Sequence, residues 1–152
     1  MNQAWTDFLT QQGLGADALD FGDRQAETSA AQLGSIMSPL LDLGLIRASG
    51  PEAAGFLHNL LTNDIESLEA LPDTVIRAGL CTPKGRMLAT FLVWREGDDF
   101  LLALAADLHA AILKKLSMYI LRSKVKLTDA SADFVLLGLS GEKAESTMRN
   151  MG

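Results

Sequence analysis

Two cations in one short turn are the side chains best placed to do chemistry in this chain. Lys84 and Arg86 flank Gly85 within the heptapeptide Cys81–Met87, CTPKGRM. Threonine, proline and glycine favour a tight turn between two strands. We therefore expect both cations at the tip of a β-hairpin, where they either face an anionic ligand or only solubilise the turn.

The other polar candidates carry weaker signals. Cys81 is the only cysteine, so no internal disulfide can form. We expect its thiol to be buried and inert; a thiol made reactive by the nearby cations of the turn is the less favoured alternative. His58 and His109 lack the HxxxH or HxxE spacing of a metal site and are predicted to lie on helix surfaces. We predict no metal site and no catalytic side chain.

Alternating and helical apolar patterns predict the elements that hold these residues. Ser49 is predicted to cap a helix, with Pro51 and Glu52 in its first turn. Asp107 is predicted to cap a second helix. The predicted order is a short helix around residues 5–9, a strand at 43–48, a helix at 53–61, three strands of a meander at 75–81, 87–94 and 100–104, a helix after residue 107, strands at 125–127 and 134–139, and a helix at 142–150.

This order lacks strict βα alternation and predicts a mixed α+β fold, with a mainly antiparallel sheet, a three-stranded meander and packed helices. The chain has 152 residues, of which 48% are hydrophobic, enough for a core. Residues 1–40 are predicted to form an N-terminal lead-in with a short helix, and residues 41–152 an α+β domain. Because the sequence stops after a helix without a tail, we expect an N-terminal fragment of a longer protein.

Charge narrows the class of partner. A net charge of −6 disfavours a general nucleic-acid or anionic-membrane binder. Five cations nevertheless cluster between Lys114 and Lys126 without an acid. A solvated helix end is favoured there, with an anion site as the alternative. The sequence shows no secretory signal and no apolar run of membrane-spanning length, so a cytoplasmic protein is expected.

Five ordered motifs resemble those of the YgfZ-like folate-binding family and, more distantly, of the glycine-cleavage T-protein (aminomethyltransferase). They cover about two-thirds of the chain, and they are LIRASG (45–50), FLHNLLTND (56–64), PKGRM (83–87), WREGDDF (94–100) and YILRSKV (119–125).

The resemblance implies a T-protein-like scaffold that binds tetrahydrofolate and assists iron–sulfur cluster assembly or repair and tRNA modification. It implies iron–sulfur proteins or tRNA-modifying enzymes as partners, without direct nucleic-acid binding, and leaves homo-oligomers open. In this implied site, Asn63 and Asp64 would address polar edges of the pterin. Lys84 and Arg86 would face the glutamyl tail, and Met87 would line the apolar slot. The residues are Asn63, Asp64, Lys84, Gly85, Arg86 and Met87. Asn63 and Asp64 would equally well end a helix.

The sequence departs from the family at three places. The YgfZ cysteine motif, K-G-C-x-x-G-Q-E, is absent, and Cys81 does not match it. Counting from the glycine turn, Leu88 and Ala89 stand where T-proteins carry an acidic pair, so a non-enzymatic role is preferred. Leu43 replaces an aromatic residue. A folate-dependent aminomethyltransferase, and an interaction module that has lost folate binding, remain the alternatives.

Overall fold

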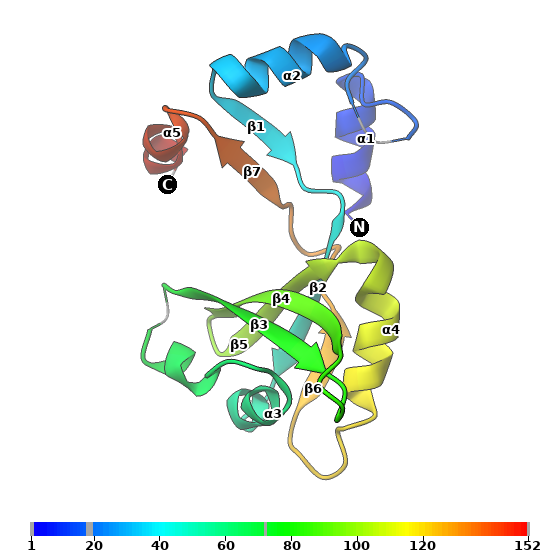
Figure 1. Cartoon of the computed structure of the whole chain (residues 1–152), viewed down its shortest axis with the longest axis vertical. Coiled ribbons are helices and arrows are strands. Elements are labelled where there is room, and N and C mark those ends of the chain that lie inside the picture. The colour runs from blue at the N-terminus through cyan, green and yellow to red at the C-terminus, as the bar shows by residue number, and fades with distance from the viewer. Residues whose placement is uncertain (1, 18–19, 72, 152) are drawn as a thin grey trace. The chain divides into compact units, whose positions relative to one another are not determined.

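The computed structural model describes residues 2–17, 20–71 and 73–151, and they form two compact units (Figure 1). One contains the described residues up to Leu41 together with those from Ala132 onward, and the other is Asp42–Ser131. The predicted domain boundary after residue 40, between a lead-in and an α+β domain, stays a prediction. The contacts group the last twenty or so described residues with the N-terminal segment, because strands from both segments pair.

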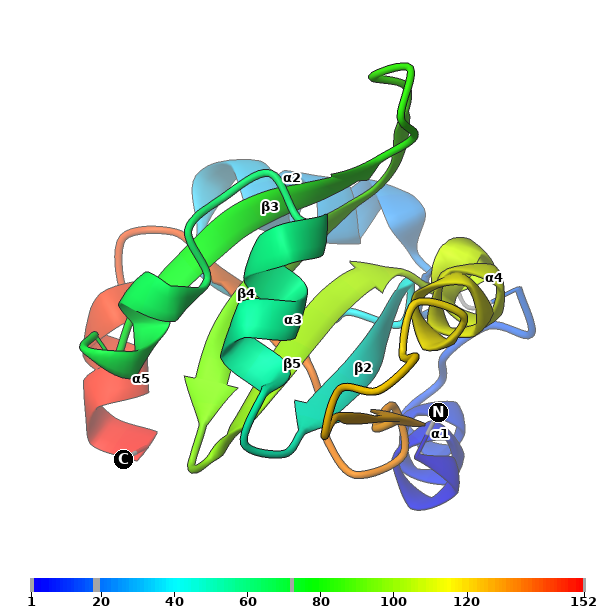
Figure 2. The same ribbon diagram turned by 90° about the horizontal axis from the view of Figure 1, so that it is seen from below.

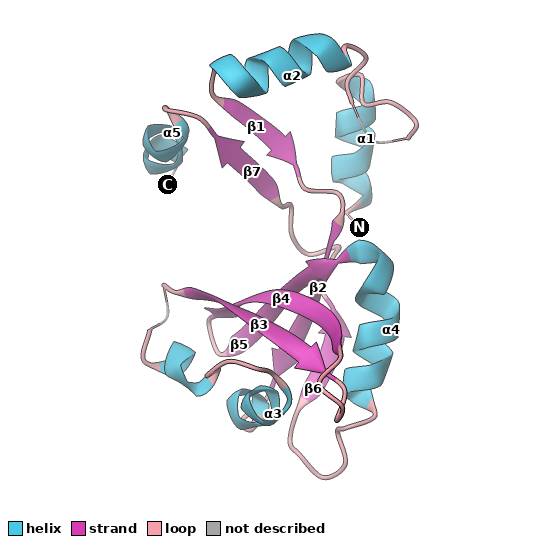
Figure 3. Ribbon diagram, viewed as in Figure 1, coloured by secondary structure: helices cyan, strands magenta, loops and turns pink. Residues whose placement is uncertain are grey.

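The first unit holds three helices and a two-stranded antiparallel sheet, coloured by type in Figure 3. In the sheet, Ile36 lies opposite Ser140 and Pro39 opposite Leu137. Its elements are α1 (Gln3–Gln11), α2 (Arg24–Leu33), β1 (Ile36–Pro39), β7 (Leu137–Ser140) and α5 (Ala144–Met151). The predicted strand at 134–139 is thus confirmed in its second half only.

Helix α2 lies within the predicted loosely packed lead-in. None of its residues is buried, so its sequence shows no apolar stripe to predict it. A local interaction starts it instead, because the Asp23 carboxylate accepts a hydrogen bond from the backbone N–H of Ala26 at 2.9 Å, as N-caps do.

The second unit is built on a five-stranded antiparallel sheet in the order β3-β4-β5-β2-β6. The meander β3-β4-β5 and the α+β class are therefore as predicted. Its elements are β2 (Leu43–Ser49), α3 (Ala53–Leu60), the 3-10 helix η1 (Glu66–Glu69), β3 (Val75–Cys81), β4 (Met87–Glu96), β5 (Asp99–Ala105), α4 (Ala106–Ser117) and β6 (Lys126–Asp129).

The core of this unit lies between one face of the sheet and the helices α3, η1 and α4 (Figure 2). Strand β4 shows the alternation expected of a sheet with one open face: Ala89, Phe91 and Val93 are buried, while Thr90 and Leu92 are exposed. The open face of β4 is therefore available to something other than the core.

The predicted capping box at the start of α3 is wrong. Ser49 is the last residue of β2, where it pairs with Lys126 of β6, and α3 begins at Ala53 without a side-chain cap. The Glu52 carboxylate accepts the backbone N–H of Lys124 at 3.1 Å instead. Sheet pairing and this distant contact prevail over the local capping pattern.

The predicted cap of α4 is also wrong, because β5 passes directly into the helix. Its first residue, Ala106, donates its N–H to the carbonyl of Asp42 at 2.8 Å. Asp107 lies inside the first turn, where a carboxylate still interacts favourably with the helix dipole.

His109 is buried, with 9% of its surface exposed, which contradicts the prediction of a surface histidine. Its Nε2 lies 2.9 Å from the carbonyl oxygen of Leu45. A carbonyl only accepts, so Nε2 carries the proton and donates. The same nitrogen is 3.4 Å from Oδ1 of Asp129. His109 thus connects α4 to both β2 and β6.

Gly44 makes room for this histidine. A Cβ atom there would lie 2.9 Å from Cδ2 of His109, closer than van der Waals contact allows.

Within the described residues, no helix is long and apolar enough to span a membrane.

We predict that Gly44→Ala lowers the free energy of unfolding by about 1–3 kcal/mol, the usual cost of an overpacked core, measured by urea titration. Gly55→Ala is the matched control. A Cβ on Gly55 in α3 would only touch Glu66 at 3.5 Å, so stability should stay equal or rise by up to about 1 kcal/mol. Equal stabilities for wild type and Gly44→Ala would contradict the close contact.

A second prediction concerns pH. Burial raises the pKa of Asp129, but hydrogen bonds from Ser131 and the charge of His109 outweigh it, so the pKa lies below the ordinary value. The carboxylate therefore stabilises the fold above the unfolded-state pKa and loses that effect as pH falls through its lowered value. The stability difference between wild type and Asp129→Asn, measured by urea titration at each pH, should shrink on acidification from about pH 7 to about pH 3.

Candidate functional site

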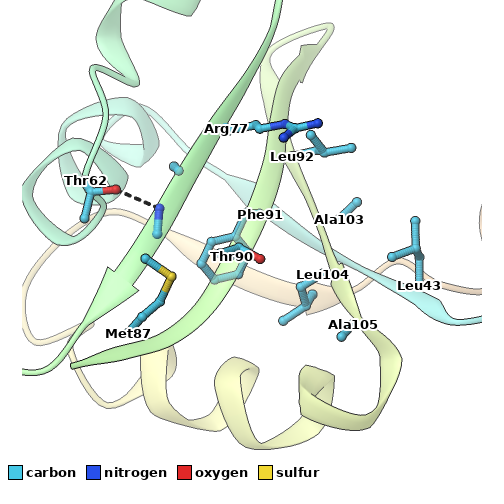
Figure 4. A pocket seen from close by; sticks show the side chains of 12 residues that line it. Leu43, Thr62, Arg77, Met87, Thr90, Phe91, Leu92, Ala103, Leu104 and Ala105 are labelled. Carbon is cyan, nitrogen blue, oxygen red and sulfur yellow. Dashed lines mark hydrogen bonds between the residues drawn. The ribbon is translucent and has the colours of Figure 1, made fainter.

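A groove opens where β4 and β5 part (Figure 4). Their pairing ends at Leu92 opposite Ala103, although β4 starts earlier, at Met87, and β5 continues to Ala105. Strand β4 stays paired with β3 along the missing stretch. The β3–β4 hairpin therefore diverges from the rest of the sheet and leaves a concavity of about 560 Å³.

A β-bulge turns Met87 into this groove. Leu80 lies opposite Ala89, but the next residue, Cys81, lies opposite Met87, so β4 holds one extra residue, Leu88. A bulge shifts the alternation of side chains by one position. Without it, Met87 would share the core face with Ala89.

Gly79 forms part of the groove's floor. A Cβ atom there would approach Cε of Met87 and Oγ1 of Thr62 to 3.3 Å each. The hydroxyl of Thr62 also accepts the Gly79 N–H at 2.8 Å. The glycine thus keeps space open between a methionine wall and a threonine wall.

The lining is mostly apolar and carries a single charge. Arg77 provides that charge, and it forms no ion pair with any residue that the structure describes. Thr62 and Thr90 add hydroxyl groups. The lining residues are Leu43, Thr62, Arg77, Ala78, Gly79, Met87, Thr90, Phe91, Leu92, Ala103, Leu104 and Ala105.

This composition suits binding rather than proton transfer. The guanidinium can hold a carboxylate or carbonyl oxygen, and the hydroxyls can donate or accept hydrogen bonds. The described lining includes no carboxylate, imidazole or thiol, the groups that usually move protons in catalysis. Elsewhere in the described residues, no three His, Cys, Asp or Glu side chains are arranged to hold a metal ion.

The six sequence-predicted site residues fall in three places. Met87 lines the groove. Lys84 and Arg86 border a separate cavity of about 440 Å³ at the hairpin turn. The β3–β4 turn itself extends beyond the sheet (Figure 2). Gly85 adopts φ +76° in this turn, a conformation that favours glycine.

Asn63 and Asp64 lie beside the groove and bond to the protein. The Asn63 side chain donates to the carbonyl of Arg77 and accepts from the N–H of Asp64, both at 2.8 Å. Asp64 Oδ1 lies 3.3 Å from Nδ1 of His58 and accepts the Ser67 N–H at 3.2 Å. Both side chains order the chain between α3 and η1.

Thr62 and Asn63 also cover the outer edge of β3. Besides its hydroxyl contact, Thr62 donates its N–H to the carbonyl of Gly79 at 3.0 Å. Leu61 forms an isolated bridge with Leu80. Together these contacts satisfy backbone groups that an edge strand would otherwise expose.

The sequence reasoning missed Arg77, Thr62 and Thr90. An arginine two residues before a glycine in an apolar strand was the available signal for Arg77. The two positions predicted to replace an acidic pair do not line the groove: Ala89 is buried in the core, and Leu88 is the extra residue of the bulge. Cys81, next to the bulge, is half-buried.

Comparison with known proteins gives consistent matches. The GCVT N-terminal domain family matches residues 17–152. The chain is 31% identical over 129 residues to the tRNA-modifying protein YgfZ of Vibrio vulnificus (strain YJ016), an alignment covering 84% of this chain and 39% of that protein. It is 33% identical over 102 residues to the iron-sulfur cluster assembly factor IBA57 homolog, mitochondrial, of Mycosarcoma maydis, covering 60% of this chain and 25% of that protein.

A solved structure has the same fold. The glycine cleavage system aminomethyltransferase T of Bartonella henselae superposes with a TM-score of 0.81 at 18% identity, over 99% of this chain and 43% of that one. At this identity the likeness shows the fold alone, and it confirms the predicted T-protein-like scaffold. The chain spans less than half the length of each of these relatives.

We predict that Asn63→Ala lowers the free energy of unfolding by about 1 kcal/mol or more, because the carbonyl of Arg77 loses its donor at the edge of β3. Asn59→Ala is the control, since the Asn59 amide bonds only within its own helix, to the carbonyl of Gly55. Urea titration measures both. Equal stability of wild type and Asn63→Ala would argue that the residue is not structural and return it to the ligand site.

Proposed function

Because the chain belongs to the GCVT N-terminal domain family, we propose that it binds a reduced folate in the groove between β4 and β5. In this proposal it acts as the folate-binding part of a YgfZ-like protein that assists iron–sulfur cluster assembly or repair and tRNA modification. The observation that carries the proposal is the apolar groove with Arg77 as its charged lining residue.

The groove has the size and chemistry that a pteridine needs. Its volume of about 560 Å³ falls within the range of small-molecule sites. Gly79 and Ala103 leave a floor without bulk, while Leu43 and Met87 supply apolar walls for a planar ring. Leu43 offers dispersion contacts but not the ring stacking of an aromatic side chain.

In this proposal Arg77 takes the role that the resemblance implied for Lys84 and Arg86. Its guanidinium would hold an oxygen-bearing edge or a carboxylate of the ligand through charge-assisted hydrogen bonds. The two hairpin cations border their own cavity, and we propose that they contact the glutamyl tail only where it leaves the groove. Bound tetrahydrofolate would supply one-carbon carrier chemistry, and the residues of this chain would bind and orient it.

An accessory role agrees with the lining of the groove. Catalysis of aminomethyl transfer requires a side chain that stabilises a cationic amine or moves a proton. Arg77 would repel such a cation, and Thr90 is uncharged at neutral pH. This favours binding without catalysis by these residues.

The physiological role follows the relatives. Their names include a tRNA-modifying protein and an iron-sulfur cluster assembly factor. We propose iron–sulfur proteins or tRNA-modifying enzymes as partners in the cytoplasm. Because this chain spans less than half of either relative, the complete activity would need more of the protein than is present here.

Two alternatives remain distinguishable. A folate-dependent aminomethyltransferase is supported by 25% identity over 137 residues to the aminomethyltransferase of Bacillus subtilis, covering 88% of this chain and 36% of that protein. It would need an acid from another part of the protein in the groove. An interaction module without folate is the second alternative, and it requires that no reduced folate binds.

We predict that calorimetric titration of the 152-residue chain with tetrahydrofolate shows binding, and that Arg77→Leu weakens it about tenfold or more, the loss of about 1.4 kcal/mol of a charge-assisted contact. The double variant Lys84→Ala/Arg86→Ala should lose less. Arg149→Leu, which removes an exposed arginine of α5 paired with Glu145, should bind like wild type.

Unchanged affinity in Arg77→Leu would remove this residue from the site. Absence of binding to wild type would reject the folate proposal and favour the interaction module. Circular dichroism and thermal unfolding of each variant separate a lost contact from a lost fold.

A further inference from the structure

Residues 114–126, here called the basic segment, hold five of the chain's thirteen lysines and arginines and none of its nineteen acids. None of the five forms an ion pair with a described residue. The nearby carboxylate of Glu52 binds the backbone N–H of Lys124. The five cations are Lys114, Lys115, Arg122, Lys124 and Lys126.

The same segment exposes three large apolar side chains. Leu121 is 88% exposed, Met118 62% and Tyr119 44%. Leaving such side chains in water forgoes about 1.5–3 kcal/mol of burial for each. Clustered exposed apolar side chains are typical of interaction surfaces, and these three lie within four consecutive residues, among cations that form no ion pair with a described residue.

Helical geometry brings the cations and apolar groups together. The Met118 N–H bonds to the carbonyl of Lys114, and the Tyr119 N–H to that of Leu116, so helical turns continue past α4. Residues three and four apart lie on the same side of a helix. Met118, whose N–H is shared between the carbonyls of Lys114 and Lys115, therefore lies beside both lysines, and Tyr119 follows it directly. Leu116 faces the core.

The loop that follows is held in place. Gly50 has φ +112°, and a Cβ atom there would clash with the carbonyl oxygen of Lys124. Glu52 fixes the N–H of Lys124, and Lys126 enters the sheet opposite Ser49. A surface fixed before binding loses less entropy when a partner docks.

We propose that the basic segment is a docking surface for a protein partner that presents acidic side chains around apolar anchors. Methionine, tyrosine and arginine are enriched at protein interfaces. A nucleic-acid backbone would pair with the cations but bury none of the three apolar side chains. Tyr119 is the one aromatic residue that the basic segment has for base stacking.

This surface is separate from the folate proposal. None of its residues lines the groove between β4 and β5. Folate titration and partner binding can therefore fail independently, and Leu121→Ser should leave tetrahydrofolate affinity unchanged.

The test uses fluorescence anisotropy with the full chain and three labelled probes of similar length. They are a glutamate-rich amphipathic peptide with leucines at helical spacing, a polyglutamate peptide, and poly-uridylate. We expect the amphipathic peptide to bind at least about tenfold more tightly than the other two, and more weakly as salt rises. Leu121→Ser and Lys124→Glu should each weaken it about fivefold to tenfold.

Matched controls come from the other unit. Leu33→Ser removes an apolar side chain that is also 88% exposed, and Lys143→Glu reverses another exposed cation. Neither should change peptide binding. Three results would overturn the proposal: no binding of the amphipathic peptide, tighter binding of poly-uridylate, or equal losses in the control variants.

Discussion

The parting of β4 from β5 is the constraint on which the candidate site depends. A continuous ladder would close the groove, because neighbouring strands lie about 4.8 Å apart. Here the β4–β5 ladder stops at Leu92 and Ala103. From Met87 to Phe91, β4 is therefore paired with β3 alone. The bulge at Leu88 increases the local bend of β4 and at the same time turns Met87 toward the opening.

That hairpin is supported from its outer edge. Leu61, Thr62 and Asn63 supply backbone and side-chain bonds to β3. The polar residues Thr62 and Asn63, which follow α3, thereby give the floor of the groove a fixed position. Asparagine is a residue type that suits ligand binding, but the Asn63 side chain already forms hydrogen bonds to the protein's own backbone, at Arg77 and Asp64.

The sequence predicted the elements with strong apolar patterns and missed what depends on distant contacts. The meander and β2 were predicted almost to the residue, because alternation and turn residues agree there. Helix α2 has no buried face, so it was missed. The capping signal of Ser49 failed because β6, more than seventy residues later, pairs with it. Arg77 lines the groove because β4 and β5 diverge beyond Leu92 and Ala103, and single-sequence periodicity does not encode that divergence.

The position of β2 has a consequence for how the chain folds. Strands β3, β4 and β5 follow one another through short turns, whereas β2 lies between β5 and β6, both distant in sequence. Local pairs close at lower entropic cost than distant ones. Leu45 and Ile46 of β2 are fully buried in the folded unit. During synthesis they leave the ribosome before β5, so β2 has no partner strand until β5 has been made. The second flank of β2 is sealed only when β6 leaves the ribosome, so a nascent chain halted before Lys126 would expose an aggregation-prone edge.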